Sequence, residues 1–239
     1  MDEDFSQFIE DFNREVKSRA DSNDYEVEEA FTEYFGGILV EYGEIDDYQP
    51  ASWLDKNIGA RVDAYHFDDD METVHLVINL WKDWNGDDIS DGRLTNSEID
   101  TTAKRAINFL NRALSGKLPA ERIDEGHPAY DLAQTISDAK DDLIKARIII
   151  VSDGKSPPRE GITYDECLIE TSLVVWDIQR VFNRQKTGER EGITIDFNDY
   201  GGPVPCVPQK SENGYYTAYL AFVSGEMLAN LYEHHKTRL

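Results

Sequence analysis

The hydrophobic positions of the first forty residues recur at steps of three and four, the period of an α-helix with one buried face. The first set is Phe5, Phe8, Ile9, Phe12 and Val16, and the second is Val27, Ala30, Phe31, Tyr34, Phe35 and Ile38. Residues 21–24 (Asp-Ser-Asn-Asp) separate the two sets and favour a turn or a helix N-cap. We therefore predict two helices, the second ending near Gly43.

Two segments that follow have the period of β-strands. They are residues 60–66 and 73–81, and residues 67–70 (Phe-Asp-Asp-Asp) between them suit a hairpin turn. Both faces of the second segment are largely apolar, which is typical of a strand in the middle of a sheet rather than at its edge.

Helices and strands alternate through the rest of the chain. We predict helices at about 95–116, 128–143, 178–185 and 226–235, strands at 147–151, 173–176, 193–197 and 215–223, and loops at 85–92, 157–158 and 201–208. Such interleaving predicts a mixed α/β (α+β) fold, with a central mixed sheet flanked by helices. We expect residues 1–45 to form a helical segment that packs on an α/β domain of residues 46–239, the two making one compact unit.

Acidic residues are concentrated in the first part of the chain. The whole sequence has 48 Asp and Glu against 24 Lys and Arg, and residues 1–100 hold 28 of these acids but only 7 of the bases. Direct nucleic-acid binding by residues 1–100 is therefore disfavoured, because contacts of Lys and Arg with phosphates drive such binding. An acidic surface favours solubility, and a sharper hypothesis is that it meets a basic partner or imitates DNA phosphates.

Several features indicate a cytoplasmic protein without a membrane segment. No stretch approaches the roughly 18 apolar residues needed to cross a bilayer. The first residues also lack the basic start and apolar run of a secretory signal. Cys167 and Cys206 stand in no metal-type spacing, which indicates free thiols in a reducing compartment.

One arrangement of polar residues has the layout of a metal-dependent nuclease with the restriction-endonuclease-like fold. In such a site a helical acid and an Asp on one strand precede an acid-x-Lys on the next strand. The carboxylates hold a divalent cation and the Lys orients the attacking water. Here Asp63 stands in the position of the first strand acid, and Glu29 or Glu33 in that of the helical acid.

The next strand lacks the remaining groups. Asn79 stands where the second acid belongs and Trp81 where the Lys belongs, while Lys82 is one residue out of step and points to the opposite face. A neutral amide and a missing Lys predict poor metal binding and poor water activation. We therefore interpret Glu29 and Asp63 as vestigial nuclease positions and expect no cofactor, with Mg²⁺ required only if the nuclease alternative holds.

Three stretches together resemble the AIPR (abortive infection phage resistance) family. One comprises residues 5–19, 28–31 (Glu-Glu-Ala-Phe) and 59–65; another is 127–133 (His-Pro-Ala-Tyr-Asp-Leu-Ala) with the strand and Ser-Asp-Gly of 147–154; the third is 219–232, followed by Arg238-Leu239. The resemblance spans most of the chain and includes no catalytic fingerprint. It implies a bacterial protein of phage resistance, associated with restriction–modification genes, whose chain continues beyond this length.

The resemblance and the degenerate site together predict a non-catalytic N-terminal module that binds or regulates. Its expected partner is another protein or the remainder of its own chain, with a homodimer as a further arrangement. Two alternatives stay open: a working metal-dependent nuclease, and an acidic DNA mimic that inhibits a DNA-binding enzyme.

Overall fold

The computed structural model describes residues 3–84, 92–118, 122–157, 162–164, 167–187, 195–210 and 217–235. They belong to two compact units, Met1–Gln185 and Lys186–Leu239. The N-terminal helices belong to the same unit as the sheet. Residues 186–239 form a unit of their own.

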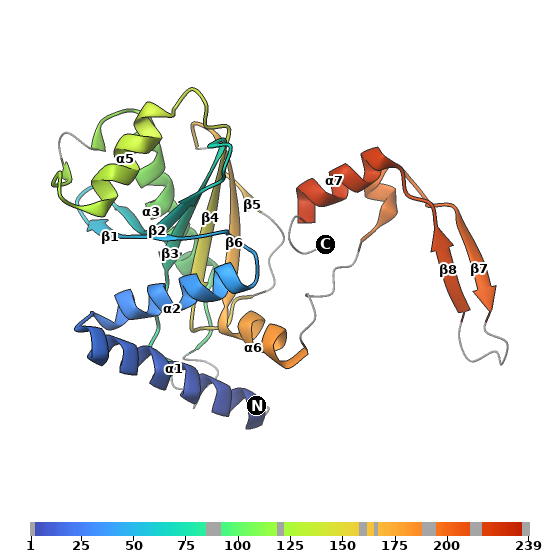
Figure 1. The fold of residues 1–239 in the computed structure, drawn as a ribbon, viewed down its shortest axis with the longest axis horizontal. Coiled ribbons are helices and arrows are strands. Elements are labelled where there is room, and N and C mark those ends of the chain that lie inside the picture. Colours follow the sequence, from blue (N-terminus) through green and yellow to red (C-terminus); the bar gives the residue numbers. More distant parts are fainter. Residues whose placement is uncertain are drawn as a thin grey trace. The chain divides into compact units, whose positions relative to one another are not determined.

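The first unit is built on a six-stranded sheet with the order β1-β2-β3-β4-β6-β5 (Figure 1). Its strands are β1 (Gln49–Asp55), β2 (Ala60–Phe67), β3 (Thr73–Asn79), β4 (Lys145–Ser152), β5 (Ile162–Thr163) and β6 (Glu170–Asp177). β1, β2 and β3 form an antiparallel meander, β3, β4 and β6 run parallel, and β5 pairs antiparallel with β6. The mixed α/β class predicted from the sequence is confirmed.

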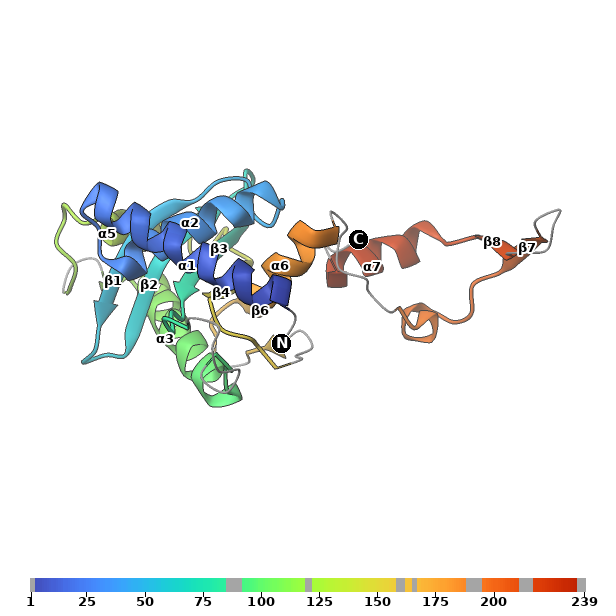
Figure 2. The same cartoon turned by 90° about the horizontal axis from the view of Figure 1, so that it is seen from below.

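Helices cover both faces of the sheet (Figures 1 and 2). They are α1 (Glu3–Asn23), α2 (Val27–Glu41), α3 (Asn96–Leu114), α5 (Pro128–Asp138) and α6 (Ile178–Thr187). Side chains of α1, α2 and α6 share one hydrophobic cluster with Val77, Ile149 and Val151. Side chains of α3 and α5 pack with alternate residues of the same strands, including Leu76, Ile148 and Ile150. Every residue of β3 is buried, which confirms its predicted central position.

Helices α3 and α5 begin at residues that suit a helix N-terminus. The Thr95 side chain accepts a hydrogen bond from the Glu98 backbone N–H, and the Glu98 carboxylate accepts one from the Thr95 backbone N–H, which forms a capping box at the start of α3. Pro128 occupies the first turn of α5, where its missing N–H has no cost. Across the described residues, no helix is long and apolar enough to cross a membrane.

The second unit contains a 3₁₀ turn, η1 (Phe197–Tyr200), a two-stranded antiparallel ribbon of β7 (Cys206–Lys210) and β8 (Thr217–Ala221), and the helix α7 (Gly225–His235). The predicted strand at 193–197 is wrong where the structure describes it, because Asp196 caps η1 by accepting a hydrogen bond from the Asn198 backbone N–H. The predicted loop at 201–208 in fact includes the start of β7. The predicted loop at 85–92 lies outside the described residues except for Gly92.

Two adjacent glycines of α2 have different surroundings. A Cβ atom added at Gly36 would lie 3.0 Å from ring atoms of Tyr48, whereas one at Gly37 would meet nothing within 4 Å. Alanine favours a helix over glycine by about 1 kcal/mol. We therefore expect Gly37→Ala to raise the free energy of unfolding by about 0.5–1 kcal/mol.

Gly36→Ala is expected to give a less stable protein than Gly37→Ala, because the gain in helix propensity is offset by crowding against Tyr48. Urea denaturation of both variants beside the wild type measures the difference. Equal stability of the two variants would show that Tyr48 does not restrict this side of α2.

Candidate functional site

Asp63 of β2 is a buried carboxylate, and its side chain is 6% exposed. The Oδ1 atom accepts a hydrogen bond from Nε of Arg61 at 3.0 Å, and Oδ2 accepts one from the backbone N–H of Asn79 at 2.8 Å. Burial raises the pKa of Asp63, while the Arg61 guanidinium and the Asn79 N–H act in the opposite direction. Both oxygens of this carboxylate are therefore engaged within the protein.

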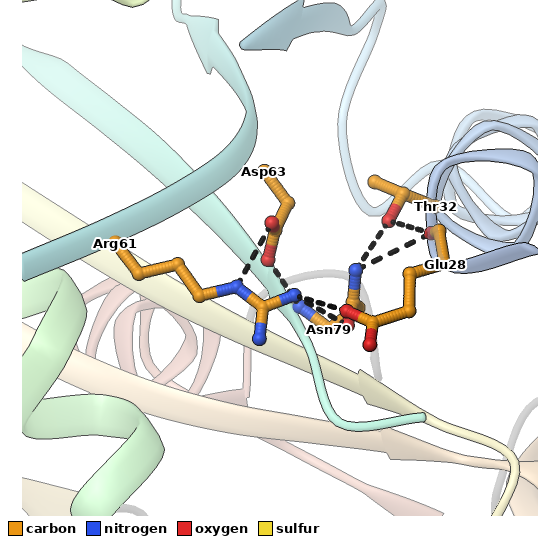
Figure 3. A network of polar contacts seen from close by, with 5 residues as sticks. All are labelled: Glu28, Thr32, Arg61, Asp63 and Asn79. Atoms are coloured by element: carbon orange, nitrogen blue, oxygen red, sulfur yellow. Dashed lines mark hydrogen bonds and ion pairs between the residues drawn. The ribbon is translucent and has the colours of Figure 1, made fainter. Parts of the chain in front are cut away.

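The guanidinium of Arg61 joins the polar groups of β2, β3 and α2 (Figure 3). Besides Asp63, it donates through Nη2 to Glu28 Oε2 at 3.0 Å and to Asn79 Oδ1 at 2.7 Å. These carboxylate and amide oxygens are the kind of ligand that a hard divalent cation prefers. A permanently charged guanidinium thus stands among the oxygens that would otherwise serve a metal ion.

The amide of Asn79 fits its place because the site needs both a donor and an acceptor. Its Oδ1 accepts from Arg61, while its Nδ2 donates to Thr32 Oγ1 at 2.8 Å and to the Glu28 carbonyl at 3.3 Å (Figure 3). The Thr32 hydroxyl in turn donates to that carbonyl at 2.8 Å. An aspartate at position 79 would direct a carboxylate oxygen at the Glu28 carbonyl with no proton to share. The neutral residue therefore holds α2 against the sheet.

The structure brings Asp63 and Asn79 together, as the strand spacing indicated, and α2 supplies an acid to them. That acid is Glu28, which is joined to Asp63 through Arg61. Glu29, the residue singled out from the sequence, is one position further along the helix and therefore about 100° away around its axis. Arg61 and Glu28 were not recognised from the sequence, although the i, i+2 spacing of Arg61 and Asp63 on one strand face was a usable signal.

Trp81 and Lys82 lie outside this polar network. The ring of Trp81 packs on Phe31 of α2 with the ring centroids 4.8 Å apart. Lys82 forms an ion pair with Glu98 at the start of α3, with Nζ 2.7 Å from Oε1. Within the described ranges, no group of three or more His, Cys, Asp or Glu side chains could hold a metal ion. The geometry is that of an internal ion-pair network.

A second buried carboxylate, Asp153, follows β4. Its Oδ1 accepts a hydrogen bond from the backbone N–H of Lys82 at 2.7 Å, and its Oδ2 accepts one from that of Trp84 at 2.9 Å. Burial raises the pKa of Asp153 to about 6, with the two N–H groups acting in the opposite direction. The side chain fastens the segment that leaves β3 to the end of the neighbouring strand.

Comparison with known proteins gives one family match. Residues 31–183 match the model of the abortive infection phage resistance protein N-terminal domain. The matched segment starts within α2, ends within α6 and includes the whole six-stranded sheet. No curated protein and no solved structure matches the chain.

The pKa of Asp153 gives a test of its burial. A carboxyl with a raised folded-state pKa stabilises the fold below its ordinary pKa of 3.8, and this contribution is lost as the pH rises through about 6. The Asp153→Asn variant has no titratable group at this position. We expect the free energy of unfolding of the wild type, relative to Asp153→Asn, to fall by about 2 kcal/mol between about pH 4 and about pH 7.

Urea denaturation of both proteins across this pH range measures that difference, since the other titrating groups cancel. Asp69→Asn, on an exposed position of the turn before β3, serves as the control and is expected to track the wild type. A constant difference between the wild type and Asp153→Asn would contradict the raised pKa.

Proposed function

The chain belongs to the abortive infection phage resistance family, and we propose that it acts there as a non-catalytic binding or regulatory module. The family gives the role in phage resistance. The absence of catalysis and the mode of action are the proposal, and the observation that carries it is the guanidinium of Arg61 between Asp63, Glu28 and Asn79.

The nuclease alternative requires a cation to replace that guanidinium. Three hydrogen bonds from Arg61 would have to break, and removing one partner of a buried ion pair costs about 3–5 kcal/mol. The cation would then find Asn79 in place of a second strand carboxylate, and Lys82 engaged with Glu98. These contacts support a polar network that fastens α2 to β2 and β3 and takes no part in hydrolysis.

The second unit supports a role in protein binding. Its ribbon, its helix and the link between them expose large apolar side chains: Val207, Tyr219, Leu220, Phe222, Val223, Leu228 and Tyr232. A two-stranded ribbon on its own is marginally stable in water, and its edges offer unpaired backbone groups. We propose that another protein, or the remainder of its own protein, covers these side chains.

A metal titration tests the proposal against the nuclease alternative. We expect no saturable binding of Mg²⁺ or Mn²⁺ to the wild-type chain by isothermal titration calorimetry, because Arg61 already neutralises Asp63. Asp63→Ala and Asp69→Ala serve as matched variants, one within the network and one on the exposed turn. Saturable binding that is lost in Asp63→Ala and kept in Asp69→Ala would refute the non-catalytic assignment.

A protection assay tests the binding role. In cells that carry the gene and are challenged with phage, we expect the double substitution Tyr219→Ser with Phe222→Ser to reduce protection, because losing two exposed aromatic anchors weakens partner binding by about tenfold or more. Asp63→Asn leaves Arg61 without its buried partner, so it is compared with the wild type at equal protein level and is expected to retain protection there. Loss of protection in Asp63→Asn at normal protein level, with full protection in the double variant, would reverse the assignment.

A further inference from the structure

We propose that Arg147, Arg180 and Arg184 of the first unit form a binding site for a phosphate-type oxyanion. Arg147 lies on β4, and the two others lie one turn apart on α6. All three side chains are almost completely withdrawn from solvent, and Arg184 is only 8% exposed. This inference does not depend on the proposed function, since no residue is shared with the network around Asp63.

Among the described residues, a buried carboxylate contacts two of these arginines. Glu44, which follows α2, has a fully buried side chain that accepts hydrogen bonds from Arg147 Nη2 and from Arg180 Nη2, the latter at 3.2 Å. The Glu44 backbone carbonyl accepts a further bond from Arg147 Nη1 at 3.1 Å. Glu41 is the nearby acid at the end of α2, and its charge adds to the effect of burial in raising the pKa of Tyr42. Its side chain is exposed to solvent. Arg147 and Arg180 thus share the buried carboxylate of Glu44.

Arg184 has two buried donor atoms without an acceptor among the described residues. These atoms are Nε and Nη2 of its guanidinium. Its Cζ atom lies 5.4 Å from the ring centroid of Tyr42 and 5.6 Å from that of Trp176. The indole Nε1 of Trp176, a residue with no exposed surface, has no acceptor either. Burying a hydrogen-bond donor without an acceptor costs free energy. Neighbouring buried donors without acceptors therefore indicate that an acceptor is missing from this place.

The chemistry of the donors identifies the ligand class. Guanidinium and indole N–H groups only donate, so the ligand must accept, and the fork of a guanidinium matches the oxygens of phosphate. Arg184 adds a positive charge with two unsatisfied donors, which a doubly charged phosphate with several acceptor oxygens matches better than a singly charged carboxylate. The Cζ atom of Arg180 lies 3.9 Å from the ring centroid of Trp176, and Tyr42 stacks on the same residue, so these contacts leave no free ring face as a platform for a nucleobase.

Isothermal titration calorimetry of inorganic phosphate into the full chain tests the site, with chloride at matched ionic strength in the reference. We expect saturable binding to the wild type and binding weakened by roughly tenfold or more in Arg184→Gln. Arg14→Gln removes the same charge from a side chain that is 70% exposed, and is expected to bind phosphate as the wild type does. Acetate is expected to bind more weakly than phosphate, as a carboxylate with one charge.

Arg184→Lys is a second variant, which keeps the positive charge but removes the paired N–H groups of the guanidinium. Circular dichroism checks the folding of each variant. Arg184→Lys is expected to bind phosphate more weakly than the wild type even if Arg184→Gln does not fold. The proposal is overturned if the wild type shows no saturable phosphate binding, if both Arg184 variants bind as tightly as the wild type, or if Arg14→Gln loses binding equally. None of these results would alter the outcome of the metal titration.

Discussion

A charge buried between α2 and the sheet must find its counter-charge inside the protein, and the arrangement of the first unit depends on this constraint. A carboxylate or guanidinium removed from water is stabilised only by a partner of opposite charge and by hydrogen bonds to its remaining atoms. Asp63 meets this requirement with Arg61, and Glu44 meets it with Arg147 and Arg180. The two networks lie at opposite ends of α2, one through Glu28 and Thr32 near its start and one just beyond its end.

Buried ion pairs of this kind contribute more to specificity than to net stability, because desolvation offsets much of the attraction. The hydrophobic contacts of Phe31, Phe35 and Leu39 hold α2 on the sheet. Those contacts alone would tolerate a shift of α2 by one turn along its axis, because each apolar side chain would then take the place of a similar apolar side chain. The hydrogen bonds of Asn79 to Thr32 and to the Glu28 carbonyl do not tolerate such a shift. The polar network therefore fixes the position that the apolar face leaves open.

The sequence predicted the elements whose apolar period is regular and missed those whose burial is partial. α1, α2, α3 and the central strands β3 and β4 follow directly from that period. β1 was missed because only Ala51 of its seven residues is fully buried, so no alternation marks it as a strand. In the candidate site, strand spacing placed Asp63 next to Asn79 correctly. The helical acid was expected at Glu29 or Glu33 and is Glu28, because the rotation of α2 about its axis depends on contacts distant in the sequence.

Distance along the sequence also explains why the ion pair of Arg147 was not predicted. Arg147 lies in a short apolar strand, and its partner Glu44 is 103 positions away, so no local pattern links them. Most of the few bases in the acidic first hundred residues also form ion pairs within the chain. Of the seven, Arg14, Lys17, Arg19, Arg61 and Lys82 form ion pairs with carboxylates of the chain. Cations engaged in this way neutralise neighbouring acids first, and a nucleic-acid phosphate would have to compete with carboxylates already in place. Most of the positive charge that this part of the chain could offer to DNA or RNA is therefore already offset by carboxylates.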